Sequence, residues 1–259
     1  MSQTLATEIY ERSRIAGSEL DALWAQGLLQ PAQTMLERPG KGFRARLVYV
    51  SWQLGGGNKA EMPAELSDII ELVHTGSLIV DDIEDSSTVR RGGPALHCSH
   101  GLPLALNTGN WMYFAALEAI GSLPINDDRT LLLLRAFSGT LLRAHQGQAL
   151  DLTARADRLA QDEIAAVAEA VSTLKTGELM GFAAYMGAVP AGGTPTACDA
   201  IRDFGKSLGF ALQALDDLSG ILNPKRAGKG REDVSSGRVT WVWRHFAKVL
   251  PREQFTALQ

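Results

Sequence analysis

The sequence predicts an all-α protein organised as a single large helical bundle, and three observations support this prediction. Its 259 residues contain no run of alternating polar and apolar residues flanked by hairpin signals, which is the pattern of a half-buried strand. Long segments rich in Ala, Leu and Glu fill most of the chain instead. Short clusters of Gly, Pro and Asn separate those segments, as expected of turns that interrupt helices.

Each predicted helix is bounded by one or more of these clusters. In chain order, the predicted helices and the clusters between them are 3–28, LERPGKG (36–42), 43–54, LGGGNKAEMP (54–63), 64–86, RRGGP (90–94), 103–120, GSLPIND (121–127), 129–152, 161–188, VPAGGTP (189–195), 195–222, NPKRAGKG (223–230) and 236–249. Their lengths suit a bundle rather than a solenoid, and no repeat period is visible. The segment 161–188 exceeds the usual globular helix, which indicates helices that line a deep central cavity.

The bulk composition is that of an ordinary globular protein and argues against two classes of protein. A chain of this length fits one large domain, so we expect residues 1–259 to form a single domain. The formal net charge of −4 argues against general nucleic-acid binding, because that activity requires a basic surface. Gly, Pro, His, Asn and Thr interrupt the uncharged stretches, so we expect no membrane span.

The cysteines and the N-terminal segment bear on location. Cys98 and Cys198 lie far apart and lack metal-type spacing, so we expect neither a disulfide framework nor a zinc site. The first residues include Glu8 and lack the apolar core of a signal peptide. We therefore expect a cytoplasmic protein.

The most informative stretch is ELVHTGSLIVDDIEDSSTVRRGG (71–93), in which four carboxylates follow an apolar segment. If 64–86 is a helix, Asp81 and Asp85 lie one turn apart on the same face. A divalent cation would relieve their repulsion, and magnesium is typically held by one or two carboxylates together with substrate phosphates. An acidic cluster is more often a solvated helix face, so this motif alone leaves both interpretations open.

A second acidic pair favours the metal site. Asp216 and Asp217 lie toward the end of an apolar helix with the sequence FGKSLGFALQALDDLSGI. Two helices that each finish in paired aspartates could face one another across a cavity and bind metal at one end, as in known helical bundles. The di-iron alternative needs a pair of Glu-x-x-His motifs, whereas the sequence contains a single one, Glu71–His74, and oxygen-only ligands indicate magnesium.

Basic residues occur where an anion bridged by those metal ions would need them. They are Arg90 and Arg91 after the first pair, Lys229 and Arg238 after the second, Lys41, Arg44 and Arg46 in PGKGFRAR, and Lys175 beside Thr176 in STLKTGEL. Each one singly is more typical of a solvated surface. Together they predict a metal-bound diphosphate and a second diphosphate held by cations alone.

Six motifs of the chain, taken in sequence order, resemble those of the trans-isoprenyl diphosphate synthases, or polyprenyl synthetases. Within this family the chain most resembles the branch that makes geranylgeranyl diphosphate. The matching segments are PGKGFR (39–44), HTGSLIVDDIEDSSTVRRGGPALH (74–97), HQGQALDL (145–152), KTGELM (175–180), LQALDDLSG (212–220) and GREDVSSGRVTW (230–241). Six motifs in the right order and spacing are far more specific than any one of them. The resemblance implies the type I isoprenoid synthase fold and a homodimer.

The resemblance also implies a role for each matching residue. The implied ligands of three substrate-bridged magnesium ions are Asp81, Asp85 and Asp216, with Asp82 and Glu84 supporting or solvated. The implied donors to the allylic diphosphate are Arg90, Lys175 and Lys229. The implied donors to isopentenyl diphosphate are Lys41, Arg44, His74 and Arg91, and Arg238 is a further substrate-binding residue. The implied neighbours of the allylic cation are Thr176 and Gln213.

The implied reaction joins isopentenyl diphosphate to an allylic diphosphate of C5 to C15 after the allylic C–O bond breaks. Metal ions and fixed cations stabilise the leaving charge, and an apolar cavity shields the carbocation from water. The small residues Gly76 and Ser77, one turn before Asp81, imply a C20 product or longer, because bulky aromatics there stop the growing chain in this family. Two interpretations of Trp111, Met112 and Tyr113 stay open: they could form the floor of that cavity, or they could be ordinary core residues.

Three features depart from the family pattern, and two alternatives remain open. Gly220 stands where many members have a third aspartate, Arg238 replaces a lysine, and the chain ends soon after TWVWRHFAKVL (240–250). A class I terpene cyclase would need an Asn/Asp-Ser-Glu second metal motif, which Gly220 and Asn223 do not supply. A non-catalytic subunit of a heteromeric synthase usually loses the first motif, which is intact here.

Overall fold

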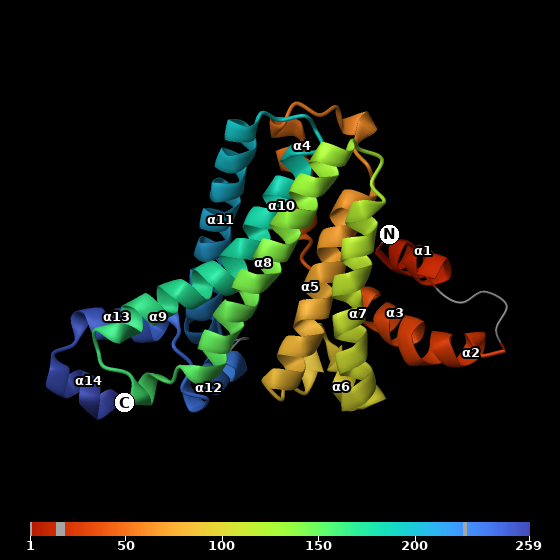
Figure 1. Ribbon diagram of the computed structural model, residues 1–259. Helices are drawn as coiled ribbons and strands as arrows, with labels where there is room; N and C mark the ends of the chain where they lie inside the picture. Colours follow the sequence, from red (N-terminus) through yellow and green to blue (C-terminus); the bar gives the residue numbers. More distant parts are fainter. Residues whose placement is uncertain (1, 14–18, 225–226) are drawn as a thin grey trace. The chain divides into compact units, whose positions relative to one another are not determined.

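The computed structural model describes residues 2–13, 19–224 and 227–259, most of which are helical (Figure 1). The side chains of Ser2, Ala227, Lys229, Glu232 and Val234 lie outside that description. The all-α prediction is confirmed. The chain divides into two compact units, Met1–Phe137 with Ala183–Asp199 and Ser138–Phe182 with Ala200–Gln259, while its organisation as one domain stays a prediction.

The first unit is built around the antiparallel pair α5 and α7, which run side by side (Figure 1). Its elements are α1 (Ser2–Ser13), α2 (Asp21–Trp24), a π-helical turn (Ala25–Leu29), α3 (Gln30–Leu36), α4 (Phe43–Leu54), a 3₁₀ turn (Lys59–Glu61), α5 (Glu65–Glu84), β1 (Val89–Arg90), β2 (Gly93–Pro94), α6 (Leu96–His100), α7 (Leu102–Gly121), and parts of α8 (Asp127–Thr153), α10 (Glu178–Ala188) and α11 (Pro195–Leu222). Two glycines allow α5 and α7 to approach closely, since a Cβ on Gly76 would lie 2.8 Å from the carbonyl oxygen of Gly109. A core that includes Met35, Ile79 and Met112 packs around this crossing.

The second unit holds the rest of α8, α10 and α11 together with the C-terminal helices. Its own elements are a 3₁₀ turn (Ala156–Arg158), α9 (Glu163–Val171), a π-helical segment (Ser172–Gly177), α12 (Ala227–Ser235), α13 (Trp241–Val249) and α14 (Arg252–Leu258). α9 packs on α13 over a core that contains Ile164, Trp243 and Phe255. The buried Glu178 joins three helices, because it accepts Arg143 of α8 at 2.8 Å and Lys206 of α11 at 2.7 Å.

Several predicted boundaries are wrong. The first predicted helix, 3–28, is not continuous: α1 ends at Ser13, residues 14–18 lie outside the described part, and a turn precedes α2. The predicted helix 161–188 changes to π-helical geometry at Ser172–Gly177. The short helices α6, α12 and α14 and the two-residue strands were missed, because such short elements leave no periodic pattern. Within the described residues, no helix has the length and apolarity needed to cross a membrane.

Candidate functional site

The first acidic motif occupies the last turn of α5. The apolar residues of this helix are buried, and its C-terminal turn closes where the amide of Asp85 donates to the carbonyl oxygen of Asp81 at 2.9 Å. This bond puts the two aspartates on one helix face, as their spacing predicted. The two carboxylates therefore lie together at the C-terminal end of α5.

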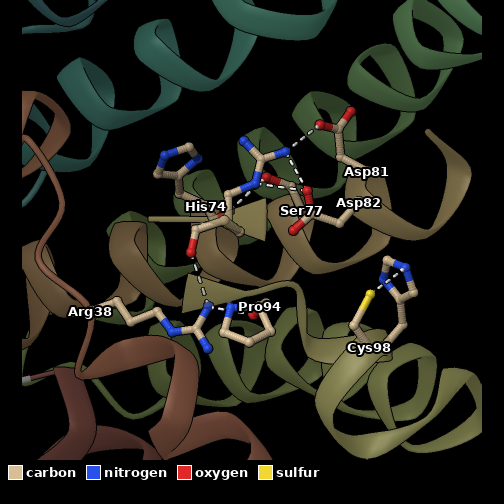
Figure 2. Close-up of polar contacts among 9 residues, drawn as sticks. Arg38, His74, Ser77, Asp81, Asp82, Pro94 and Cys98 are labelled. Atoms are coloured by element: carbon tan, nitrogen blue, oxygen red, sulfur yellow. Dashed lines mark hydrogen bonds and ion pairs between the residues drawn. The ribbon is translucent and has the colours of Figure 1, made fainter. Parts of the chain in front are cut away.

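Asp82, between these two aspartates in sequence, pairs with Arg90. It is fully buried, and its Oδ1 accepts both Nε, at 2.7 Å, and Nη2 of Arg90. The same Nη2 lies 3.4 Å from Oδ2 of Asp81, so one guanidinium joins the two adjacent aspartates (Figure 2). Burial opposes the charged form of Arg90, but the bond to Asp82 and the negative charges of Asp82, Asp81 and Asp85 together outweigh it and raise the arginine pKa. The interpretation of Asp82 as solvated is therefore wrong, and its supporting role stays a prediction.

A two-residue hairpin presents the paired arginines. Strands β1 and β2 pair antiparallel, and the connecting residues Arg91 and Gly92 both have left-handed φ values, of 49° and 76°. This is the geometry of a tight type I′ turn, in which a non-glycine residue is uncommon. The turn separates the two side chains, because Arg90 pairs with Asp82 while Nη2 of Arg91 lies 3.8 Å from Glu71.

Arg38, which the sequence interpretation missed, holds this hairpin. Its Nη1 donates to the carbonyl oxygens of Arg90, at 3.0 Å, and of Pro94, at 2.7 Å, and thus binds both strands (Figure 2). Gly93 leaves room for the guanidinium, because a Cβ there would lie 3.0 Å from Cζ of Arg38. The only sequence signal is the position of Arg38 in the predicted turn LERPGKG.

Replacing Arg38 by Gln should loosen the hairpin. We expect the free energy of unfolding to fall by about 1–3 kcal/mol, because two carbonyl groups lose a charged donor. Hydrogen exchange of the Ala95 amide, which donates to Thr88 at 2.9 Å across the hairpin base, should become faster. Arg46→Gln, at an exposed position of α4, is the matched control. Equal exchange in the two variants would contradict the assignment.

Arg44 and His74 form the second basic group. Nη1 of Arg44 lies 3.0 Å from Nε2 of His74. Because a guanidinium only donates, Nε2 must accept, so His74 is neutral and carries its proton on Nδ1. Burial, followed by repulsion from Arg44, lowers the pKa of His74 well below 6.5. Arg91 lies near this pair, since its charge also lowers the pKa of Arg44.

The segment PGKG lies against the same group. A Cβ on Gly40 would lie 3.2 Å from Nη2 of Arg91, so this glycine provides space for the guanidinium. The structure thus brings together three of the four residues predicted to bind the second diphosphate, Arg44, His74 and Arg91. The fourth, Lys41, is exposed.

The neutral state of His74 has a consequence for stability. In the unfolded chain His74 takes up a proton near pH 6.5, whereas the native state resists protonation until a lower pH. The unfolded state therefore binds more protons below pH 6.5, and native stability should fall on acidification. Compared with His74→Gln, the wild type should lose unfolding free energy between pH 7 and pH 5.5 by up to about 1.4 kcal/mol per pH unit. Urea unfolding at both pH values tests this, and equal pH slopes would contradict it.

In the second unit, a π-helical segment carries Lys175 and Thr176. Such segments are rare and frequently lie at functional sites. Glycines allow both neighbouring helices to approach it: a Cβ on Gly147 of α8 would lie 2.7 Å from the main-chain nitrogen of Lys175, and one on Gly209 of α11 would lie 2.9 Å from Gly177. The segment is thus held between two helices at backbone distance.

Side-chain bonds fix the two polar residues of this segment. Nζ of Lys175 donates to Oδ2 of Asp151 at 2.7 Å, and Thr176 Oγ1 donates to Oε1 of Gln213 at 2.8 Å. Asp151 lies one turn after Gly147 in the motif HQGQALDL, so α8 supplies both the close approach and the carboxylate. The structure thus brings together Thr176 and Gln213, the two residues that the resemblance implies beside the allylic cation. The sequence interpretation gave no role to Asp151.

The second acidic motif lies on α11. Asp216 is half-buried, whereas the adjacent Asp217 is buried and bonded within the protein. Gly220 takes part in a close backbone contact, because a Cβ on Gly230 of α12 would lie 2.3 Å from its carbonyl oxygen. Lys229 was predicted to donate to the allylic diphosphate, but its side chain is not among those that the structure describes. The amide of Arg238 donates to the carbonyl oxygen of Asp233 at 3.1 Å in the turn after α12.

The donor set fits magnesium held partly by a substrate. Among the side chains that the structure describes, no three His, Cys, Asp or Glu residues gather as a closed metal site. Asp81 and Asp85 instead offer carboxylate oxygens one turn apart. Magnesium usually keeps several water or phosphate ligands besides one or two carboxylates. The residues present therefore suit a phosphate-bridged ion rather than an all-protein cage.

Comparison with known proteins adds an independent finding. The family model described as Polyprenyl synthetase matches residues 25–259. A geranylgeranyl pyrophosphate synthase of Eremothecium gossypii is 36% identical over 132 residues, which are 48% of this chain and 39% of that protein. A short chain isoprenyl diphosphate synthase of Methanothermobacter thermautotrophicus is 31% identical over 219 residues, or 82% of this chain and 65% of that protein. The chain thus spans less than two thirds of the length of either relative.

A solved structure supports the fold. The geranylgeranyl pyrophosphate synthetase of Pyrococcus horikoshii superposes with a TM-score of 0.82 at 24% identity, covering 99% of this chain and 76% of that one. The likeness extends over both compact units and shows that the chain has the same all-α fold.

Proposed function

Because the chain belongs to the polyprenyl synthetase family, we propose that it is a trans-prenyltransferase that condenses isopentenyl diphosphate head-to-tail with an allylic diphosphate of C5 to C15. The observation that carries the proposal is the presence of two separate basic groups in the first unit. Arg90 pairs with Asp81 and Asp82, whereas Arg44 and Arg91 lie with His74. Two diphosphates bound in different ways require such an arrangement.

In this proposal the carboxylates Asp81, Asp85 and Asp216 hold three magnesium ions, which neutralise the charge of the departing diphosphate when bound. Arg90, Lys175 and Lys229 donate to the same diphosphate. The Asp82–Arg90 and Asp151–Lys175 pairs support the assignment, because each keeps a cationic side chain extended and ordered before substrate arrives. Little reorganisation is then needed when the C–O bond breaks.

In the same proposal, isopentenyl diphosphate is held by a second group, which consists of Lys41, Arg44, His74 and Arg91, and Arg238 is a further substrate-binding residue. A neutral His74 suits this role, since it accepts from Arg44 at Nε2 and keeps an N–H donor at Nδ1. The Thr176 and Gln213 oxygens then lie beside the allylic cation, and the proton lost after carbon–carbon bond formation passes to the released diphosphate. No strong side-chain base is required.

The product is proposed to be C20, or longer, on the basis of the small residues Gly76 and Ser77. Gly76 has a packing reason of its own, the contact with Gly109, so Ser77 is the better probe. Ser77→Phe should shorten the product by at least one C5 unit, because an aromatic ring would fill the space before Asp81. Chromatography of the dephosphorylated products measures this, with Ser77→Ala as the control. An unchanged product length in Ser77→Phe would contradict the chain-length role.

A homodimer and a cytoplasmic location complete the proposal. Helix α7 exposes an apolar stripe, formed by Leu102, Leu106, Phe114 and Leu117, with a gap of two turns between Leu106 and Phe114. A second copy of the chain would cover such a face. Light scattering of the intact protein and of Phe114→Glu tests the dimer. Both cysteines are free thiols, as suits a reducing compartment.

The activity is tested by incubation with magnesium, isopentenyl diphosphate and each of the C5, C10 and C15 allylic diphosphates. An elongated diphosphate is the expected product. Hydrocarbon or alcohol formed from an allylic diphosphate alone would indicate a terpene cyclase instead. A complete lack of product with every pairing would overturn the proposal, if it is seen both with the protein by itself and after a family member that is inactive by itself has been added.

A further inference from the structure

We infer that Asp217, the second carboxylate of DDLSG, is a positioning residue that orients Gln213 and Thr176 and ties them to the start of α13. This inference deepens the proposed function, since it rests on Thr176 and Gln213 facing the allylic cation. Asp217 is only 8% exposed, and each of its carboxylate oxygens accepts a hydrogen bond from the protein. Its neighbour Asp216, the proposed metal ligand, is half-buried.

The first oxygen of Asp217 fixes the direction of the Gln213 amide. Oδ1 lies 2.8 Å from Nε2 of Gln213, and a carboxylate only accepts, so the amide nitrogen must point toward Asp217. The amide oxygen must then point toward Thr176, whose Oγ1 lies 2.8 Å away. Oε1 has no proton to give, so the Thr176 hydroxyl donates to it. The remaining lone pairs of Thr176 are left to face a cation.

The second oxygen of Asp217 anchors the C-terminal helices. Oδ2 accepts the main-chain amide of Trp241, the first residue of α13, at 3.0 Å. The indole of Trp241 returns to the π-helical segment, where Nε1 donates to Ser172 Oγ at 2.8 Å. Arg244 covers one face of this indole at 4.6 Å, and Phe210 packs edge-on at 4.9 Å. The ring is therefore held on three sides.

The contacts form a closed circuit. It runs from Thr176 through Gln213 and Asp217 to Trp241, and from there to Ser172, one turn before Thr176 in the same π-helical segment. Movement of α13 is thus transmitted to Thr176 through bonds of 2.8–3.0 Å rather than through loose packing. The two adjacent aspartates therefore have different roles. Asp216 is the proposed magnesium ligand, whereas Asp217 fixes the orientation of the Gln213 amide and, through it, of the Thr176 hydroxyl.

Asp217→Asn tests the inference, because an amide has one acceptor oxygen instead of two and keeps the volume. We expect kcat to fall by about 10- to 100-fold, since charge-assisted bonds of this kind are lost. Half-saturating magnesium and the KM for isopentenyl diphosphate should stay within about twofold of the wild type, because the bonds on which the inference rests run from Asp217 to Gln213 and Trp241. Asp216→Asn should instead raise half-saturating magnesium. Asp203→Asn, on an exposed turn of the same helix, is the matched control.

Two further readouts keep the inference falsifiable. Combining Asp217→Asn with Gln213→Leu should be no worse than Gln213→Leu alone, because both act through one circuit. Hydrogen exchange of the Trp241 amide should become faster in Asp217→Asn and stay unchanged in Asp203→Asn. A rise in half-saturating magnesium equal to that of Asp216→Asn, or unchanged Trp241 exchange, overturns the inference. If the wild type elongates no substrate, the proposed function fails, and the exchange experiment still tests the circuit.

Discussion

Asp81→Asn should lower turnover by about three orders of magnitude or more, because a neutral amide cannot hold a divalent cation as a carboxylate does. The substitution keeps the volume of the side chain. Asp82, rather than Asp81, makes the close contacts with Arg90, so the hairpin and its arginines should stay in position. The loss should therefore appear in kcat and in the magnesium dependence rather than in the thermal midpoint of unfolding.

The control is Glu84→Gln, an acidic-to-amide change at an exposed position on the same turn of α5. It should retain turnover and the magnesium dependence of the wild type. Full turnover in Asp81→Asn at low magnesium would show that the first acidic motif is not a metal site. A loss of equal size in Glu84→Gln would mean that the whole acidic cluster acts through its net charge.

Gly147→Val should damage both stability and catalysis. A Cβ at this position would lie 2.7 Å from the main-chain nitrogen of Lys175 and from Cβ of Leu174, so α8 must move away from the π-helical segment. Overpacking of this kind lowers the free energy of unfolding by about 1–3 kcal/mol. The displacement also separates Asp151 from Lys175, whose bond is 2.7 Å long, and we expect kcat to fall by at least about tenfold.

Denaturant unfolding and steady-state kinetics on the same preparations measure the two effects. Gly121→Val is the matched control, since a Cβ at that glycine would meet no atom within 4 Å. Stability and kcat equal to those of the control would contradict a tight contact between α8 and the π-helical segment. A loss of stability with unchanged kcat would mean that this contact only holds the fold.

The long helices and the paired residues of the site could be predicted from the sequence because their signals are local. Asp81 and Asp85 are four residues apart, so helical geometry alone places them on one face. The breakers around α7, α8 and α11 contain Gly or Pro, whose backbone preferences mark helix ends to within a few residues. The family resemblance implied that Thr176 and Gln213 both lie beside the allylic cation, which stays a prediction, and the structure joins the two side chains by a bond of 2.8 Å.

The remaining features depend on contacts between distant segments. Arg38 holds a hairpin 52 residues later in the chain, and no local pattern links the two. The π-helical turn at Ser172–Gly177 consists of residues that an ordinary helix would accept, so no local pattern marks it. Gly147 and Gly209 approach this turn closely from two other helices. The family resemblance implied a role for Asp216 but none for Asp217, whose burial and bonds to Gln213 and Trp241 depend on contacts that the sequence does not show.

The central claim is that the protein condenses isopentenyl diphosphate with an allylic diphosphate. The most direct test incubates the protein with isotopically labelled isopentenyl diphosphate, magnesium and a C15 allylic diphosphate, and measures the label in the product. The account predicts a labelled C20 diphosphate, or a longer homologue, with one label for each C5 unit added. It also predicts that chelation of the metal stops incorporation. Failure to incorporate label into any product, under conditions where the protein is folded and magnesium is saturating, would contradict the account.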